Sequence, residues 1–257
     1  MQYRAVTGNR GLLSTQRRSL LLSRLKAEGR LVATDLAAEL ALSEDTIRRD
    51  LRDLAAEGLL VRVHGGALPA SPTNIPLARR RDLQADAKRR LAQAALRLVR
   101  PGMTVLVDGG TTTLALMAAL APDMALTVVT HSPGIALALE GHAAVDVILV
   151  GGRLYRHSMV ACGPEAQAGF ARVRADLCLL GVTGVHPQTG LTTGDPEEAM
   201  LKCTMMAAAA ETVLMATPDK MAVSGVWVIA ALDRLGTLVS VGPRPEWLPQ
   251  GVAHLMA

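Results

Sequence analysis

Aromatic residues are scarce in this chain, at 2% of its 257 residues. Proteins that bind single-stranded nucleic acid use aromatic rings as stacking platforms, so this scarcity argues against that class. The three cysteines are far apart, at Cys162, Cys178 and Cys203, which favours reduced thiols over a disulfide framework or a metal site. No apolar run reaches the roughly 18 to 20 residues of a membrane span, and residues 1–18 lack the apolar stretch of a signal peptide. We therefore expect a cytoplasmic protein that needs neither a metal nor a cofactor.

What the chain does contain is a large apolar fraction and an uneven charge. Hydrophobic residues make up 50% and are mostly Ala, Leu and Val, which favours helices and parallel strands. Residues 1–100 hold 19 Lys and Arg against 10 Asp and Glu, whereas residues 101–257 hold 8 against 13, so +9 and −5 give the net charge of +4. A basic front half favours a polyanionic partner, although an unevenly charged surface explains the charge alone equally well.

The first part of the chain is predicted to be a small helical unit followed by a hairpin. Residues 1–13 show no periodic pattern and are expected to be a disordered tail. Three short helices are predicted, at about residues 15–28, 34–40 and 43–57. The run from Leu59 to His64 alternates like a strand, and Gly65-Gly66 predicts a hairpin turn. Residues 14–68 are thus expected to form a winged helix-turn-helix.

The third predicted helix, from Ser43 onward, has two different faces. At 100° per residue, three aliphatic residues gather on one side: Ile47, Leu51 and Leu54. Three arginines project from the other side: Arg48, Arg49 and Arg52. Ser43 occupies the position of a helix N-cap. Such a helix, placed third in a compact unit, is typical of a recognition helix that enters the major groove of DNA.

Arginine suits this role because its guanidinium can bind guanine edges or phosphates. The hairpin would lie beside the helix as a wing, where Arg62 or His64 could contact phosphate. Taken alone, a helix with three arginines is usually a surface helix whose arginines pair with nearby carboxylates, here Glu44, Asp50 and Asp53. The preceding helices and the following hairpin favour DNA binding.

Three prolines, at positions 69, 72 and 76, mark residues 69–78 as a linker between two domains. A basic helix is predicted after it, from Arg79 to about Val99. Short apolar runs then alternate with helical stretches, at residues 104–108, 126–130, 145–150, 177–180 and 212–216. This alternation is typical of a largely parallel sheet covered on both faces, so residues 79–257 are expected to be an α/β domain.

The loop VDGGTTT, residues 107–113, follows one predicted strand and precedes a helix. Its glycines allow the backbone to approach an anion, and the first amides of the next helix carry the positive end of the helix dipole. The loop matches neither a P-loop nor a dinucleotide fingerprint. It predicts a phosphate site or, with equal weight, a tight turn capped by threonine.

Other small or charged residues follow neighbouring strands, among them Gly152, Gly181 and Lys220. Ligands of open parallel sheets bind beyond the carboxyl ends of the strands, so these residues are expected to converge on one crevice. Glu198 and Lys202 lie four residues apart on a helix. From spacing alone they are an ordinary surface ion pair.

The stretch LSEDTIRRDLRDLAAEGLLVRVHGGA, residues 42–67, resembles the N-terminal segment of DeoR-type bacterial regulators. It shares their Thr-Ile-Arg-Arg-Asp-Leu core and their closing Arg-x-His-Gly-Gly. The resemblance implies DNA contacts by residues of the third helix. With the cap and the wing, the candidate DNA-binding residues are Ser43, Thr46, Arg48, Arg49, Arg52, Arg62 and His64.

The resemblance continues to about Ser240. In DeoR-type regulators the C-terminal domain resembles ribose-5-phosphate isomerase and senses a phosphorylated sugar or a similar metabolite. The resemblance implies phosphate binding by residues 110–112 and sugar or carboxylate contacts by the acidic and lysine residues. The candidate effector-binding residues are Asp108, Gly109, Gly110, Thr111, Thr112, Thr113, His131, Gly152, Gly181, Glu198, Lys202 and Lys220.

The sequence departs from the family pattern at several of these positions. His131 stands where the family commonly has Asn, and Thr217 stands where it usually has Asp. An expected aromatic is replaced by Met221, and the late Thr-Asp pair reads Ser240-Val241. The phosphate loop is retained, whereas the part that reads sugar hydroxyls is altered, so the identity of the effector stays open.

We therefore expect a DNA-binding repressor of carbohydrate metabolism genes that a phosphorylated effector releases from a double-stranded operator. A helix-turn-helix monomer covers little DNA, so a homodimer or homotetramer is expected. One alternative is a sugar-phosphate isomerase or deaminase, with Asp108 or Glu198 as base and Lys202 or Lys220 as its partner. The other is a structural nucleoid or RNA-binding protein, against which the shortage of aromatics argues.

Overall fold

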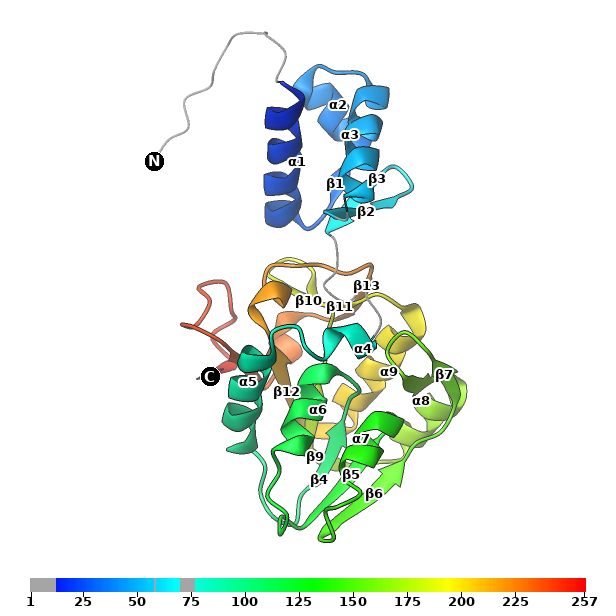
Figure 1. Cartoon of the computed structure of the whole chain (residues 1–257), viewed down its shortest axis with the longest axis vertical. Coiled ribbons are helices and arrows are strands. Elements are labelled where there is room, and N and C mark those ends of the chain that lie inside the picture. Colours follow the sequence, from blue (N-terminus) through cyan, green and yellow to red (C-terminus); the bar gives the residue numbers. More distant parts are fainter. Residues whose placement is uncertain (1–12, 58, 70–76) are drawn as a thin grey trace. The chain divides into compact units, whose positions relative to one another are not determined.

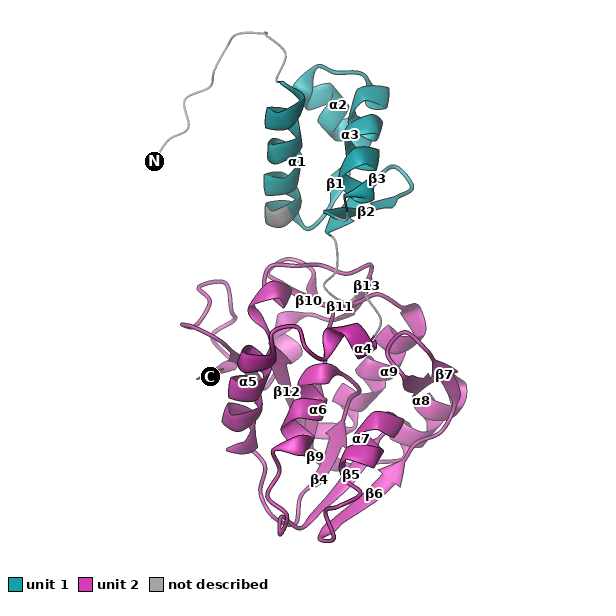
Figure 2. Cartoon of the chain, in the orientation of Figure 1, with its two compact units in different colours: residues 1–70 teal, residues 71–257 magenta. Residues whose placement is uncertain are grey.

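The computed structural model of the protein describes residues 13–57, 59–69 and 77–257. The chain divides into two compact units, a first unit of residues 1–70 and a second unit of residues 71–257 (Figure 2). The predicted tail, apart from Leu13, lies outside the described residues, and so do residues 70–76 of the predicted linker. Pro69 still belongs to a strand and Leu77 begins a helix, so regular structure extends into both ends of that linker.

In its described residues, the first unit combines three helices with a three-stranded sheet (Figure 1). The helices are α1 (Ser14–Glu28), α2 (Ala33–Leu40) and α3 (Glu44–Ala56). The strands are β1 (Leu31–Val32), β2 (Leu60–Val63) and β3 (Gly66–Pro69). Strand β3 lies between the other two and runs antiparallel to both. The buried aliphatic side chains of the helices and of β2 form one core, which holds this helix-turn-helix and its hairpin together.

The turn between β2 and β3 consists of His64 and Gly65, one residue earlier than the predicted Gly65-Gly66, and Gly66 begins β3. Gly65 has a φ of 84°, which a residue without a side chain adopts most readily. Gly66 is required for a different reason, because a Cβ there would lie 1.8 Å from the carbonyl oxygen of Leu31. The hairpin therefore depends on one glycine for its turn and on the other for close packing against β1.

The second unit is built on a seven-stranded sheet in the order β15-β14-β12-β9-β4-β5-β6. All neighbouring pairs in it are parallel. Its strands are β4 (Thr104–Val107), β5 (Leu126–Thr130), β6 (Val145–Leu149), β9 (Ala175–Leu180), β12 (Ala209–Ala216), β14 (Thr237–Ser240) and β15 (Ala253–Met256). The five apolar runs of the sequence form β4, β5, β6, β9 and β12, which confirms the predicted parallel α/β architecture.

Helices cover both faces of this sheet (Figure 1). One face packs against α5 (Ala85–Leu96), α6 (Thr111–Ala118) and α7 (Pro133–Ala138). The other packs against α8 (Pro164–Ala171) and α9 (Pro196–Ala207). Burial on both faces explains why the strands are apolar runs without alternation. Within the described residues, no helix has both the length and the apolar character that crossing a membrane requires.

Smaller elements complete the second unit. A three-stranded antiparallel sheet is formed by β10 (Gly184–His186), β11 (Gly190–Thr193) and β13 (Trp227–Ala230). A hairpin is formed by β7 (Arg153–Tyr155) and β8 (Val160–Cys162). Two short 3-10 helices are η1 (Pro218–Lys220) and η2 (Leu232–Arg234). None of these elements is predicted from the sequence pattern.

The single basic helix predicted from Arg79 to Val99 is wrong. The segment forms α4 (Leu77–Arg80) and then α5, with Gln84 between them in the left-handed region at a φ of 56°. Lys88 of α5 is buried, and its ammonium donates to the main-chain carbonyls of Arg80 and Arg81. The lysine thus binds carbonyls that a continuous helix would have used internally, and α4 turns away from α5.

The order of the strands reverses at β4. From there β5 and β6 lie on one side, whereas β9, β12, β14 and β15 lie on the other. Connections that leave neighbouring strands in opposite directions open a crevice beyond their carboxyl ends, and ligands of open α/β sheets bind there. The ends of β4 and β9 are therefore the position at which this fold best accommodates a ligand.

Candidate DNA-binding helix and effector cavity

Helix α3 presents the two faces that the sequence predicts. Ile47, Leu51 and Leu54 are at most 1% exposed, whereas Arg48, Arg49 and Arg52 are exposed. Ser43 caps the helix, because its Oγ accepts a hydrogen bond from the main-chain N–H of Thr46 at 3.2 Å. The two hydroxyls also share a hydrogen bond of 2.9 Å. On the hairpin, Arg62 and His64 are exposed as well.

The acidic residues of α3 leave most of its positive charge unpaired. Asp50 is buried and accepts hydrogen bonds from Arg17 of α1, with Nη2–Oδ1 at 3.0 Å. Arg48 pairs with Glu44 at 2.6 Å on the surface. Two arginines have neither a hydrogen bond nor an ion pair within the described part of the chain: Arg49 and Arg52. The alternative function of α3, a surface helix whose arginines pair with its own carboxylates, therefore explains Arg48 but neither Arg49 nor Arg52.

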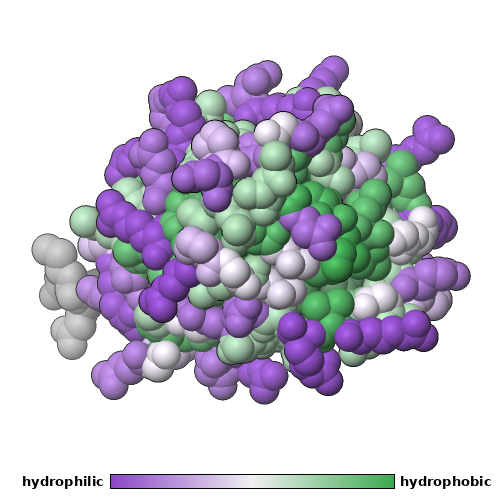
Figure 3. Space-filling model, turned by 90° about the horizontal axis from the view of Figure 1, so that it is seen from below, coloured by the Kyte–Doolittle hydropathy of each residue, from purple (hydrophilic) through white to green (hydrophobic). Residues whose placement is uncertain are grey.

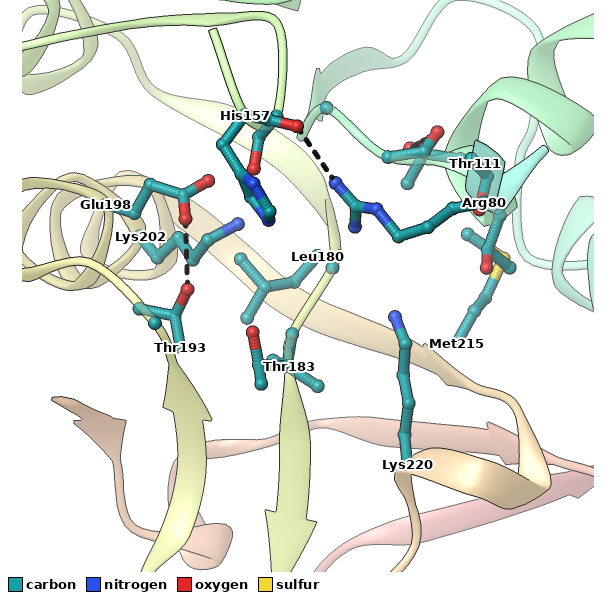
Figure 4. A pocket seen from close by; sticks show the side chains of 18 of the residues that line it. Arg80, Thr111, His157, Leu180, Thr183, Thr193, Glu198, Lys202, Met215 and Lys220 are labelled. Carbon is teal, nitrogen blue, oxygen red and sulfur yellow. Dashed lines mark hydrogen bonds between the residues drawn. The ribbon is translucent and has the colours of Figure 1, made fainter. Parts of the chain in front are cut away.

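A cavity of about 180 Å³ opens at the carboxyl ends of β4, β9 and β12 (Figure 4). Nine of the twelve predicted effector residues line it: Gly109, Gly110, Thr111, Thr112, Thr113, Gly181, Glu198, Lys202 and Lys220. The first main-chain hydrogen bond of α6 runs from Leu114 N to Gly110 O at 3.0 Å. The amides of the three threonines therefore precede the helical ladder, at the positive end of the α6 dipole.

Asp108 and His131, both predicted to contact the effector, are fully buried and do not line the cavity. One carboxylate oxygen of Asp108 is hydrogen-bonded to His131 Nε2 at 3.0 Å. The other accepts from the Lys202 ammonium and from the Gly181 N–H, the latter at 2.8 Å. Both carboxylate oxygens are thus occupied within the protein. Asp108 and His131 lie behind the cavity wall and hold Lys202 and Gly181 in place.

The pair of Asp108 and Lys202 is charged at neutral pH. Burial acts to raise the pKa of the Asp108 carboxyl, but the Lys202 ammonium and the hydrogen bond from His131 hold that pKa far below its usual value. Burial acts to lower the pKa of Lys202, and the Asp108 carboxylate reverses this, so the pKa of Lys202 is raised. A buried ion pair therefore fixes the lysine at the base of the cavity.

Gly152 also lies away from the cavity. It has a φ of 147°, and a Cβ on it would meet the carbonyl oxygen of Cys162 at 2.7 Å. This glycine serves close packing between the end of β6 and β8. Its prediction as an effector contact followed from its place after a strand, which the structure explains by packing instead.

Several residues of the cavity wall were not predicted from the sequence. They belong to elements that the sequence pattern did not predict or placed wrongly, and they are Arg80, Tyr155, His157, Ser158, Thr183, Thr193 and Gly194. The run Arg79-Arg80-Arg81 was the one available signal, and it was assigned to a continuous helix. The β7–β8 hairpin gave no pattern long enough to detect.

The two ends of the cavity differ in charge (Figure 4). At one end, Arg80 Nη2 donates to the His157 carbonyl at 3.4 Å, and Arg80 Nε is buried without a partner among the described residues. Lys220 reaches toward the same end, and burial, assisted by Arg80, lowers its pKa to about 8. At the other end, Glu198 Oε2 accepts a hydrogen bond from the Thr193 hydroxyl at 3.1 Å. The first end suits an anion and the second suits hydroxyl groups.

Two family models match the chain. Residues 17–73 match the DeoR-like helix-turn-helix domain, and residues 83–240 match the DeoR C terminal sensor domain. The chain belongs to the DeoR family of transcriptional regulators. Of the functions considered from the sequence, this membership supports the transcriptional regulator over the sugar-phosphate isomerase or deaminase. In this DeoR-family protein most of the cavity lies within the matched sensor domain, whereas Arg80 lies between the two matched regions.

Relatives of similar length support the assignment. The HTH-type transcriptional regulator GlpR of Haloferax volcanii is 33% identical over 218 residues, which cover 84% of this chain and 85% of the relative. The glycerol-3-phosphate regulon repressor of Escherichia coli K12 is 28% identical over 232 residues, covering 90% and 92%. Ribose 5-phosphate isomerase A of Methanocaldococcus jannaschii matches 53% of this chain and 54% of its own at 16% identity, with a TM-score of 0.40. A likeness that distant carries no conclusion.

Proposed function

We propose that this DeoR-family protein is a repressor of carbohydrate or polyol metabolism genes, and that a phosphorylated small metabolite weakens its hold on the operator. The observation that carries the proposal is the cationic end of the cavity, where Arg80 and Lys220 lie beside the first amides of α6. Helix N-termini and arginine forks are established partners of phosphate. The name of one relative, the glycerol-3-phosphate regulon repressor, is in keeping with such an effector.

The metabolite is small and carries hydroxyl groups next to its phosphate. Glu198, Thr193 and Lys202 at the opposite end offer acceptors and donors for those hydroxyls. A cavity of about 180 Å³ accommodates a short phosphorylated sugar or polyol and leaves no room for a polymer. In this arrangement residues 109–113 and Lys220 bind the phosphate, whereas Glu198 and Lys202 select the carbon chain.

The DNA-binding side of the proposal rests on α3. Arg49 and Arg52 have no hydrogen-bond or ion-pair partner among the described residues, project from the face opposite the core, and can reach base edges or phosphates in a major groove. Arg48, Thr46 and Ser43 lie at or near the start of the helix, and the hairpin adds Arg62 and His64 as phosphate contacts. As a regulator that acts on chromosomal DNA, the protein works in the cytoplasm.

We infer that the protein acts as a homodimer or homotetramer on its double-stranded operator. Strand β6 is an edge strand with β5 as its neighbour, and three large aliphatic side chains near it are exposed: Leu137, Ile148 and Leu149. On the lower face of the molecule hydrophobic residues gather in a patch with hydrophilic residues around it (Figure 3). Exposed patches of this kind mark association surfaces. Sedimentation equilibrium of the purified chain tests the inference, and a monomer at micromolar concentration would contradict it.

Ligand binding tests the effector directly. Glycerol 3-phosphate and ribose 5-phosphate are expected to raise the melting temperature of the second unit, because a ligand that binds the folded state alone stabilises it. Glycerol and ribose serve as matched compounds without the phosphate and are expected to have little effect. A Lys220→Met variant should respond less than the wild type. If the phosphorylated and unphosphorylated members of each pair shift the melting temperature equally, the phosphate group does not contribute to binding, and this part of the proposal is contradicted.

A further inference from the structure

Helix α4 occupies a particular place in the chain. It is the first described element of the second unit, and residues 70–76 connect it to Pro69, the last residue of β3. Its last residue, Arg80, lines the cavity. A ligand that binds Arg80 therefore contacts the helix that directly follows residues 70–76, which connect the two units in the chain.

Polar contacts at both ends of α4 help to hold it in position. None of its four residues is fully buried, and two of them, Leu77 and Arg80, are half-buried. At its start, Leu77 N donates to the His157 carbonyl at 3.2 Å, and at its end Arg80 Nη2 donates to the same oxygen at 3.4 Å. The Lys88 ammonium binds the Arg80 carbonyl. Segments with little buried apolar surface open at low free energy, so α4 responds readily to a change in these contacts.

The charges around Arg80 are unbalanced. A second, smaller cavity adjoins the first and is lined by Arg80, Lys88 and Lys220 beside Thr111. Burial and the neighbouring cations lower the pKa of Lys220, and burial together with Arg80 lowers that of Lys88. Asp219 is the acidic residue that this smaller cavity offers in return. The cluster thus carries more positive than negative charge, and its Arg80 Nε lacks a hydrogen-bond acceptor among the described residues.

We propose that Arg80 is the positioning residue through which the bound phosphate group fixes α4, and so passes effector binding to the connection with the first unit. The inference rests on the proposed function, since it concerns the same cavity. A phosphate between Arg80 and Lys220 accepts hydrogen bonds from the guanidinium and neutralises the cluster. The anion then joins α4 to α6 and η1. It thereby fixes the position of the helix that follows residues 70–76 in the chain. Without the anion, α4 depends on the His157 carbonyl and Lys88.

Amide hydrogen exchange of the full-length protein tests this step, with glycerol 3-phosphate as the probe. In the wild type, saturating probe is expected to slow exchange of residues 77–84 about fivefold or more, the lower range of an allosteric coupling. Arg80→Gln should lose this protection while the amides of residues 111–113 stay protected by the probe. Arg79→Gln is the matched control, since Arg79 is exposed on the same helix and does not line the cavity.

Operator binding provides the second measurement. At saturating probe, Arg80→Gln is expected to keep the operator affinity that it has without the probe, whereas the wild type loses operator affinity. Arg79→Gln should release the operator like the wild type. Full protection of residues 77–84 together with full release in Arg80→Gln would overturn the inference and leave the proposed effector intact. If the probe protects neither residues 77–84 nor residues 111–113 in the wild type, the result contradicts the proposed function itself, because the cavity then does not bind this phosphorylated compound.

Discussion

Asp50 of α3 bonds to Arg17 of α1 and not to the arginines of its own helix. The pair is mostly buried, with one contact of 3.0 Å between Arg17 Nη2 and Asp50 Oδ1. It fixes the orientation of α3 against α1, and it holds the Asp50 carboxylate on the buried side of the helix, away from the exposed arginines. The outward arginines thereby keep their charge for an external anion.

Arg49→Ala and Arg52→Ala are each expected to weaken operator binding by about 1 to 3 kcal/mol if the side chain contacts a base. Fluorescence anisotropy with a labelled operator, selected from a random pool, gives the affinities. Arg89→Ala is the control, because Arg89 is an exposed arginine of α5 in the second unit. Unchanged affinity in both α3 variants would contradict the assignment of this helix.

Asp50→Ala is expected to destabilise the first unit by about 3 kcal/mol, since it removes the mostly buried ion pair that joins α3 to α1. Glu44→Ala is the comparison, because it removes the exposed pair with Arg48, and such pairs contribute about 1 kcal/mol or less. Urea denaturation followed by circular dichroism measures both. Equal small losses would show that the buried pair does not hold α3 in place.

Asp108→Asn is expected to lower the free energy of unfolding of the second unit by about 3 to 5 kcal/mol, because Lys202 remains buried without its counter-charge. A double variant, Asp108→Asn with Lys202→Met, removes both charges and should be more stable than the single variant. Additive losses would argue against a coupled pair. Because the pKa of Asp108 is depressed, its contribution is complete at neutral pH and declines as the pH falls below about 4.

Anion binding should weaken as the pH rises from 7 to 9. The pKa of Lys220 is about 8, so its ammonium is present at pH 7 and is largely lost at pH 9. Binding of a phosphate favours the protonated lysine, and linkage then gives a decrease in affinity of up to about tenfold over this range. Isothermal titration with glycerol 3-phosphate measures the profile. Lys220→Met should flatten it, and an equally steep profile in that variant would assign the dependence to another group.

The sequence predicted those features that depend on local pattern. The two faces of α3, the presence of a hairpin with its turn within one residue of the predicted position, and five strands of the parallel sheet follow from periodicity and from glycine placement. The loop at residues 108–113 was also found, because a strand, two glycines and a helix start stand next to one another in the chain.

Features that depend on tertiary contacts were not predictable in this way. The break between α4 and α5 requires a non-glycine residue, Gln84, in the left-handed region, and a buried lysine that captures the carbonyls of α4. Nothing in the local pattern marks either one. The resemblance to DeoR-type regulators implied effector contacts for Asp108 and His131, whereas here the two side chains are hydrogen-bonded to each other inside the protein.

The most direct test is the operator affinity of the full chain with and without phosphorylated metabolites. Glycerol 3-phosphate or ribose 5-phosphate at saturation should weaken operator binding at least about fivefold, and glycerol or ribose should leave it unchanged. An affinity that no phosphorylated compound alters would contradict control of this regulator through the cavity.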